Sequence, residues 1–216
     1  MILSKYSPIN IEVHKTYNIT KNHIENKPLC LFISYSGNTE ETVSALEDAI
    51  KGDLEWCVIS SGGTLLEMAK ENSKPYIEVP SGLQPRAAFG LMTKAVASFI
   101  PESLGVNVEQ NCNDSSVYLN ELLDNESENK IIKKAKEIAN NIGNKTVIIY
   151  GGTQLSYLAS QRWKTQINEN AKSKSYVGYM PEVHHNEILS WEADKAGSKN
   201  NFYLIFLRDQ NEHPKI

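Results

Sequence analysis

Two serines, a glycine, an asparagine and a threonine directly follow an apolar run in SYSGNT, residues 34–39. Small residues let the backbone wrap an anion, and hydroxyl groups add hydrogen-bond donors. A helical pattern begins at once, and its N-terminal dipole favours negative charge. Ser34, Ser36 and Thr39 are therefore predicted to bind phosphate. The alternative is that Asn38 only caps the helix, with a glutamate three residues further on as its capping-box partner.

An arginine follows a later strand-like run. Arg86, in the sequence PRAA, lies just inside the start of a predicted helix that follows residues 76–79. It is therefore expected on the same edge of the protein as the hydroxyl-rich turn, where an arginine can pair with a phosphate or a sugar oxygen. The sequence equally allows a solvated surface arginine.

Candidates for proton transfer gather in the segment 162–192. A carboxylate and an imidazole are the groups that shuttle protons next to a carbonyl, and the candidates here are Glu169, Glu182, His184, His185 and Glu187. Such residues are also common on protein surfaces, so their types alone assign no role. Glu169 ends a predicted helix, where a carboxylate opposes the dipole. That position favours a function for Glu169 other than helix stability.

The elements that position these residues alternate between strands and helices. Strand-like runs cover residues 29–34, 56–60 and 76–79, with helical patterns between them and a third helix from Pro85 to about Ile100. This alternation predicts βαβ units and a parallel sheet. Ligands bind at the carboxyl ends of parallel strands, which is where the hydroxyl-rich turn lies.

The second half of the chain repeats this order. A helix over residues 131–142 is expected to stop at Gly143, and a strand, a Gly-Gly-Thr turn and a helix then follow within residues 146–168. Residues 175–180 and 202–207 are the last strand candidates, and residues 9–17 alternate like one more strand. Residues 101–128 are polar and are interpreted as an irregular connection with short helical pieces. The pattern predicts two α/β subdomains.

Composition and charge exclude several classes of binding partner. The net charge of −4 without a long basic run argues against nucleic acid. No stretch resembles a signal peptide or is long enough to span a membrane, so a cytoplasmic protein is predicted. Cys30 and Cys57 lie in apolar runs as inert buried thiols. The adjacent His184 and His185 have no second ligand cluster at metal-binding spacing, so no metal is expected.

Four motifs together resemble the bifunctional phosphoglucose/phosphomannose isomerases of the sugar isomerase (SIS) domain family. They are SYSGNTEET, PRAA, NENAK and HHNEI followed by SWE, and they occur in the family's order between residues 30 and 192. The resemblance implies two SIS subdomains with mainly parallel sheets flanked by helices. It also implies a homodimer with a shared active site, a small sugar phosphate as substrate and no cofactor.

The resemblance also assigns roles residue by residue. Ser34, Ser36 and Thr39 look like the phosphate-binding hydroxyls, and Arg86 resembles the arginine that steadies an enediol-type intermediate. Glu169 matches the base that moves a proton between C1 and C2. His185, which directly precedes Asn186, resembles the ring-opening histidine that the neighbouring subunit supplies, with His184 as an adjacent rival. The implied reaction interconverts glucose 6-phosphate, or mannose 6-phosphate, and fructose 6-phosphate.

The sequence also departs from the family pattern. Residues 1–105 are interpreted as a first SIS-like subdomain without its opening strand and glycine-rich turn, residues 106–145 as a connection and helix, and residues 146–216 as a partial second subdomain. Both sheets are therefore expected to be incomplete relative to the family. The family's C-terminal lysine and threonine have no counterpart here.

Two further readings stay open. A sugar-phosphate-binding protein without catalytic activity would keep the hydroxyl turn alone. A flavodoxin-like electron carrier is the second, because Ser-x-Ser-Gly-Asn-Thr is similar to a loop that binds the phosphate of FMN. Against it, a strand is expected before the turn, and the second strand–turn–helix unit would have no role.

Overall fold

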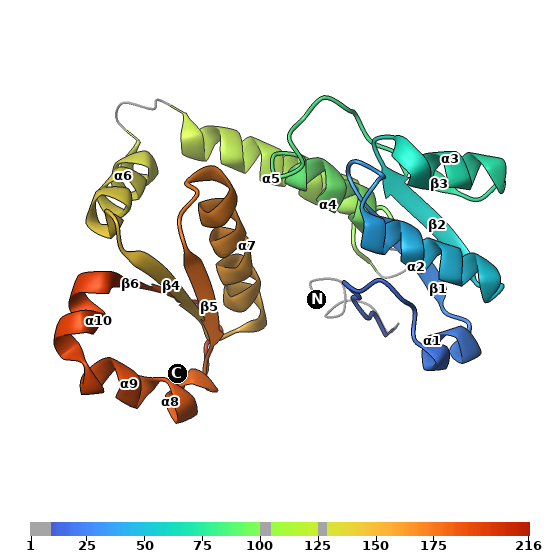
Figure 1. The fold of residues 1–216 in the computed structure, drawn as a ribbon. Helices are drawn as coiled ribbons and strands as arrows, with labels where there is room; N and C mark the ends of the chain where they lie inside the picture. The colour runs from blue at the N-terminus through green and yellow to red at the C-terminus, as the bar shows by residue number, and fades with distance from the viewer. Residues whose placement is uncertain (1–9, 100–104, 125–128) are drawn as a thin grey trace. The chain divides into compact units, whose positions relative to one another are not determined.

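The computed structural model describes residues 10–99, 105–124 and 129–216, and this part of the chain forms two compact units (Figure 1). The first unit extends to Asp114 and the second begins at Ser115. Each unit is an α/β structure built on a three-stranded parallel sheet. The predicted fold class, two small parallel sheets flanked by helices, is therefore confirmed.

The sheet of the first unit has the strand order β1-β2-β3. The strands are β1 (Leu29–Ile33), β2 (Glu55–Ser60) and β3 (Tyr76–Glu78). Phe32 lies beside Val58, and Ile59 lies beside Ile77 in the parallel register. All three strands occur where apolar runs predicted them, so their carboxyl ends and the loops that follow share one edge.

Helices cover both faces of this sheet, and α1 (Lys21–Asn26) precedes it. On one face α2 (Glu40–Lys51) and α3 (Gly63–Glu71) bury Leu46, Leu65 and their apolar neighbours against β1 and β2. On the other, α4 (Phe89–Ala97) places Ala95 against Ile59 and Val79. Burial on both faces explains why β2 is a nearly continuous apolar run.

The sheet of the second unit has the strand order β5-β4-β6. Its strands are β4 (Thr146–Gly151), β5 (Ser175–Tyr179) and β6 (Phe202–Leu207). The long helix α7 (Gln154–Asn170) packs against this sheet, and Trp191 of α9 joins the buried cluster of Ile148 and Tyr150. The remaining helices are α6 (Lys130–Ile142), α8 (Val183–Asn186), α9 (Ile188–Ala193) and α10 (Lys195–Asn201).

Three expectations about the elements are wrong. The predicted connection holds one long helix, α5 (Val108–Leu123), in which no residue is buried. Residues 10–17 form no strand, and Val13 there is 70% exposed. Helix α4 begins at Phe89, so residues 85–88, including Arg86, form a turn. Among the described helices, none combines the length and hydropathy that a membrane crossing requires.

Candidate functional site

Three hydroxyl groups converge in the loop between β1 and α2. The Oγ of Ser34, which is buried, lies 2.7 Å from Thr39 Oγ1 and 3.4 Å from Ser36 Oγ. The backbone N–H of Gly37 donates to Ser34 Oγ at 3.2 Å, and that of Asn38 donates to Ser36 Oγ at 3.2 Å. The loop therefore brings together the three residues that the sequence predicted as phosphate ligands.

These hydroxyls do not cap helix α2. Its N-cap residue is Thr39, whose side chain makes no capping hydrogen bond. The first helical bonds run from Thr42 N and Val43 N to Thr39 O, both at 3.0 Å, so the amides before them project from the end of the helix. Asn38 Oδ1 accepts hydrogen bonds from Thr64 N and Thr64 Oγ1 at 3.0 Å each. The alternative that Asn38 caps the helix is therefore wrong.

A second loop, which the sequence analysis missed, supports the first. It joins β2 to α3 in the sequence Ser60-Ser61-Gly62-Gly63, in which Ser60 ends the strand and Gly63 begins the helix. Gly37 has φ +70°, and a Cβ there would lie 1.8 Å from the Gly62 carbonyl oxygen. Gly63 has φ +71°, and a Cβ there would lie 2.4 Å from the Ser36 carbonyl oxygen. Both positions require glycine. Two serines and two glycines directly after a strand were the available signal.

Tyr35 connects the loops at this edge of the sheet. Its carbonyl oxygen accepts from Ser61 N at 3.0 Å and from Ser61 Oγ at 2.6 Å. Its phenol donates to Pro80 O at 3.0 Å and accepts from Leu83 N at 2.9 Å. The loop after β3 is thereby held at the carboxyl edge of the sheet. The same loop leads to half-buried Arg86, on the edge where the sequence predicted it.

The corresponding turn in the second unit is closed by its own side chains. Thr153 Oγ1 accepts from Ser156 N at 3.0 Å, and Ser156 Oγ accepts from Thr153 N at 2.9 Å, which is a complete capping box. Ser156 Oγ also accepts from Gly152 N at 3.0 Å, while Thr153 Oγ1 donates to Asp209 at 2.8 Å. A carboxylate therefore lies where an anion would bind, and the two turns are not equivalent.

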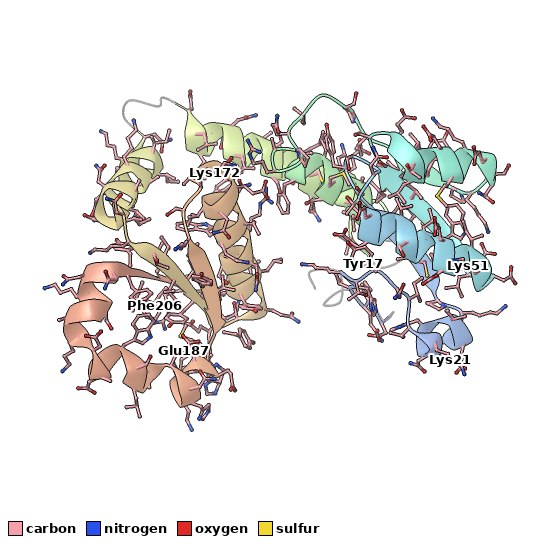
Figure 2. All side chains as sticks on the ribbon, viewed as in Figure 1. Tyr17, Lys21, Lys51, Lys172, Glu187 and Phe206 are labelled. Atoms are coloured by element: carbon pink, nitrogen blue, oxygen red, sulfur yellow. The ribbon has the colours of Figure 1, made fainter. Side chains whose placement is uncertain are left out.

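Glu169 and His185 lie at opposite ends of the second unit. Glu169 is exposed near the C-terminal end of α7, whose 17 residues span about 25 Å. His185 lies in α8, just beyond the carboxyl end of β5 and therefore beside the N-terminal end of α7. Figure 2 labels Lys172, which follows α7, and Glu187, which follows α8, at opposite ends of this unit. One copy of the unit does not bring Glu169 and His185 together.

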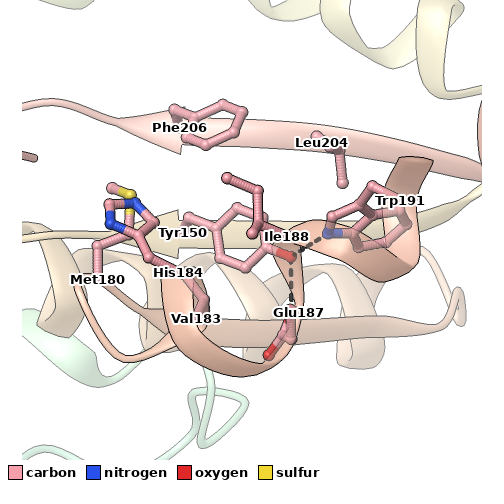
Figure 3. Close-up of a pocket in the computed structure, with 9 residues that line it drawn as sticks. All are labelled: Tyr150, Met180, Val183, His184, Glu187, Ile188, Trp191, Leu204 and Phe206. Atoms are coloured by element: carbon pink, nitrogen blue, oxygen red, sulfur yellow. Dashed lines mark hydrogen bonds between the residues drawn. The ribbon is translucent and has the colours of Figure 1, made fainter. Parts of the chain in front are cut away.

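A buried tyrosine fixes the segment that carries the histidines (Figure 3). Tyr150 of β4 donates its phenolic hydrogen to Glu187 Oε2 at 2.7 Å and accepts from Trp191 Nε1 at 3.0 Å. Burial, and next the hydrogen bond to Glu187, raise the pKa of Tyr150 well above its usual value. The HHNEI and SWE motifs thus dock α8 and α9 onto the sheet.

The same segment separates the two adjacent histidines. His184 lines a cavity of about 90 Å³ together with Tyr150, Glu187 and apolar neighbours (Figure 3). His185 is exposed. An exposed imidazole can reach a ligand or another molecule, whereas His184 faces the interior of its own unit. His185, which the sequence favoured over His184, is therefore the more accessible of the two.

Solved structures identify the fold. Tagatose-6-phosphate ketose/aldose isomerase from Escherichia coli matches with a TM-score of 0.57 at 18% sequence identity, over 87% of this chain and 49% of that one. At this identity the likeness is one of fold. The fold is that of the SIS phosphosugar isomerases.

Sequence comparison finds relatives over most of this chain. Residues 131–216 match the bacterial phospho-glucose isomerase C-terminal SIS domain. A bifunctional phosphoglucose/phosphomannose isomerase from Aquifex aeolicus is 37% identical over 193 residues, 89% of this chain and 56% of that protein. Over most of its length the chain is similar to the bifunctional phosphoglucose/phosphomannose isomerases of the SIS family. A D-glucosamine-6-phosphate 4-epimerase from Sulfolobus acidocaldarius is 30% identical over 93% of this chain and 61% of its own length. The chain thus spans little more than half of either relative.

Proposed function

We propose that this protein is an aldose–ketose isomerase that interconverts glucose 6-phosphate, and mannose 6-phosphate, with fructose 6-phosphate. The observation that carries the proposal is the cluster of Ser34, Ser36 and Thr39 at an N-terminus that they do not cap. Such a cluster offers O–H donors, beside the first amides of α2, to the oxygens of a phosphate ester. The choice of a hexose phosphate as substrate follows from the similarity to phosphoglucose/phosphomannose isomerases.

The reaction needs a base, a ring-opening group and a positive charge. Glu169 would take the proton from C2 of the open-chain aldose and return it to C1 through a cis-enediol. His185 would first assist opening of the sugar ring by moving a proton to the ring oxygen. Arg86 would stabilise the negative charge that develops on the enediol oxygens. The phosphate would anchor the substrate and leave these three groups to act on the other end.

A site shared between two copies of the chain is part of the proposal. Glu169 lies near the C-terminal end of α7, and His185 lies in α8 beside the N-terminal end of α7, so roughly the length of this helix, about 25 Å, lies between them. A six-carbon sugar is too short to touch both within one copy. Two copies related by a two-fold axis would form two equivalent sites, each with Glu169 from one chain and His185 from the other.

The test is conversion of glucose 6-phosphate followed by product identification. We expect fructose 6-phosphate to form, and we expect Glu169→Gln to abolish its formation while substrate binding persists. Glu137→Gln is the matched control, because Glu137 lies on the exposed surface of α6 and pairs with the neighbouring Lys134. Turnover by Glu169→Gln equal to that of the unchanged protein would overturn the assignment of the base.

Two outcomes would point to other functions. The 30% identical epimerase makes C4 inversion of an amino sugar phosphate a second candidate, and the same assay with glucosamine 6-phosphate would detect it as a galactosamine 6-phosphate product. Calorimetric binding of fructose 6-phosphate without turnover of either sugar would instead identify a protein that binds sugar phosphates without catalysis.

A further inference from the structure

One carboxylate and two imidazoles meet before the first strand of unit one. Glu12 Oε2 lies 2.7 Å from His23 Nε2 and 3.5 Å from His14 Nε2. The two imidazole rings are 4.4 Å apart, edge to face. One ligand atom from each residue lies within 4.8 Å of the other two. None of these three residues belongs to the proposed isomerase site.

We propose that Glu12, His14 and His23 bind a divalent transition-metal ion of the Zn²⁺ class. Zinc takes imidazole nitrogen and carboxylate oxygen at about 2.0–2.2 Å, and two such ligands at tetrahedral positions are therefore about 3.3 Å apart. The carboxylate–imidazole distances of 2.7 and 3.5 Å lie on either side of that value. Small side-chain rotations are enough to surround an ion.

The surroundings of His23 hold its ring ready for such an ion. Thr20 Oγ1 lies 2.5 Å from His23 Nδ1, so the other ring nitrogen, Nε2, faces the carboxylate. A partner on the second ring nitrogen is what fixes the orientation of histidine ligands in metal sites. The side chain of His23 is 23% exposed, whereas Glu12 and His14 are about half exposed. The ion would therefore keep water in its fourth position and exchange with solvent.

Binding would fasten the start of the described chain to the first unit. Glu12 and His14 lie in a segment without helix or strand, whereas His23 belongs to α1. Ile24 of the same helix packs against the core beneath α2, close to Gly52. An ion held by all three ligands would link the irregular segment to this core. Its effect is on stability, independent of any isomerase activity.

The sequence analysis missed this site because its ligands do not form a compact motif. Glu12 and His14 are two residues apart, and His23 follows nine residues later. Only the turn into α1, where Thr20 is the N-cap residue, brings the second histidine back to the first.

The test is titration of the chelator-treated full chain with Zn²⁺ by calorimetry, together with thermal unfolding. We expect one ion per chain, a higher melting temperature with Zn²⁺, and at least tenfold weaker binding in His23→Gln and in His14→Gln. His184→Gln and His213→Gln are matched controls, because they remove imidazoles of the second unit, and they should bind as the unchanged protein does.

Circular dichroism shows whether each variant is still folded, and so separates loss of the metal site from loss of the fold. Thr20→Val is a milder variant that keeps all three ligands and should weaken Zn²⁺ binding severalfold. The proposal is overturned if the unchanged chain binds no Zn²⁺. It is equally overturned if folded His23→Gln and His14→Gln bind Zn²⁺ as tightly as the unchanged chain.

Discussion

Two threonines at equivalent helix starts show how partners decide the role of a residue. Thr153 and Ser156 satisfy each other's backbone in a capping box, and Thr153 also contacts Asp209. Thr39 makes no such bond, and its hydroxyl points instead to Ser34. SGNT (residues 36–39) and GGT (residues 151–153) both occur where a strand is succeeded by a helix, so the sequence alone does not distinguish a turn left open to an anion from one closed by its own chain.

Removing two of the three hydroxyls should weaken binding of a phosphate ester. Hydrogen bonds to charged groups contribute about 1.5–3 kcal/mol each, so Ser36→Ala combined with Thr39→Val is expected to reduce affinity for fructose 6-phosphate by at least about 100-fold. Isothermal titration calorimetry measures this. Thr153→Val is the control, and it should lose about 1 kcal/mol of stability but keep its affinity. Unchanged affinity in the double variant would reduce the SYSGNT loop to a structural turn.

Tyr150 supplies a prediction about stability. Tyr150→Phe leaves the Glu187 carboxylate and the Trp191 indole without their shared partner, so the free energy of unfolding should fall by about 1–3 kcal/mol. Denaturant unfolding measures the change. Tyr176→Phe is the control, because Tyr176 is 56% exposed, and it should alter stability by less than about 0.5 kcal/mol. A loss no larger than that of the control would mean that the buried hydrogen bonds contribute nothing.

The pH dependence of that difference has a definite sign. The pKa of Tyr150 is raised in the folded protein by burial and by Glu187, while the unfolded side chain ionises near pH 10. Above that pH the unfolded state gains ionised tyrosine that the folded state resists, so the unchanged protein loses stability that Tyr150→Phe cannot lose. The stability gap between the two should therefore narrow above about pH 10. A constant gap would contradict the raised pKa.

At the scale of elements, apolar patterns predicted well what the cores bury. The six strands occur where apolar runs placed them, and helices α2, α3, α6 and α7 also match. Helix α5 was missed because its first half, residues 108–116, is mostly polar, so no continuous apolar stripe marks it. The short helices α8 and α9 were missed for another reason. Hydrogen bonds of Tyr150 with Glu187 and Trp191 hold them against β4. Such tertiary contacts leave no periodic pattern in the local sequence.

The close approach of two loops depends on glycine. Gly37→Ala would force a left-handed residue to carry a Cβ only 1.8 Å from the Gly62 carbonyl oxygen, so we expect more than about 2 kcal/mol of destabilisation together with weaker phosphate-ester binding. Gly90→Ala in α4 is the control, since nothing lies within 4 Å of the added Cβ, and it should stabilise the helix by up to about 1 kcal/mol. Equal stability of both variants would show that the loops do not need their contact.

At the scale of the molecule, the distance between the candidate site residues could not be predicted from their spacing in the sequence. Glu169 and His185 are sixteen positions apart in sequence, which gives no hint of their separation. The distance follows from topology: α7 runs back along the sheet, and β5 then returns to the opposite edge before α8 begins. Family resemblance assigned both residues to one reaction, and their separation within one copy is the reason for proposing a site shared between two copies.

Mixing two inactive variants tests the proposed shared site. Glu169→Gln and His185→Ala should each be inactive as pure proteins. In a hybrid dimer one site combines both defects, and the other combines an intact Glu169 with an intact His185. Random pairing makes about half of the dimers hybrids, each with one working site of two, so co-expression should restore roughly one quarter of the turnover of the unchanged protein. Different affinity tags on the two variants verify that hybrids form. Purified hybrids without turnover would show that the two residues do not meet across an interface, and the shared site would have to be abandoned.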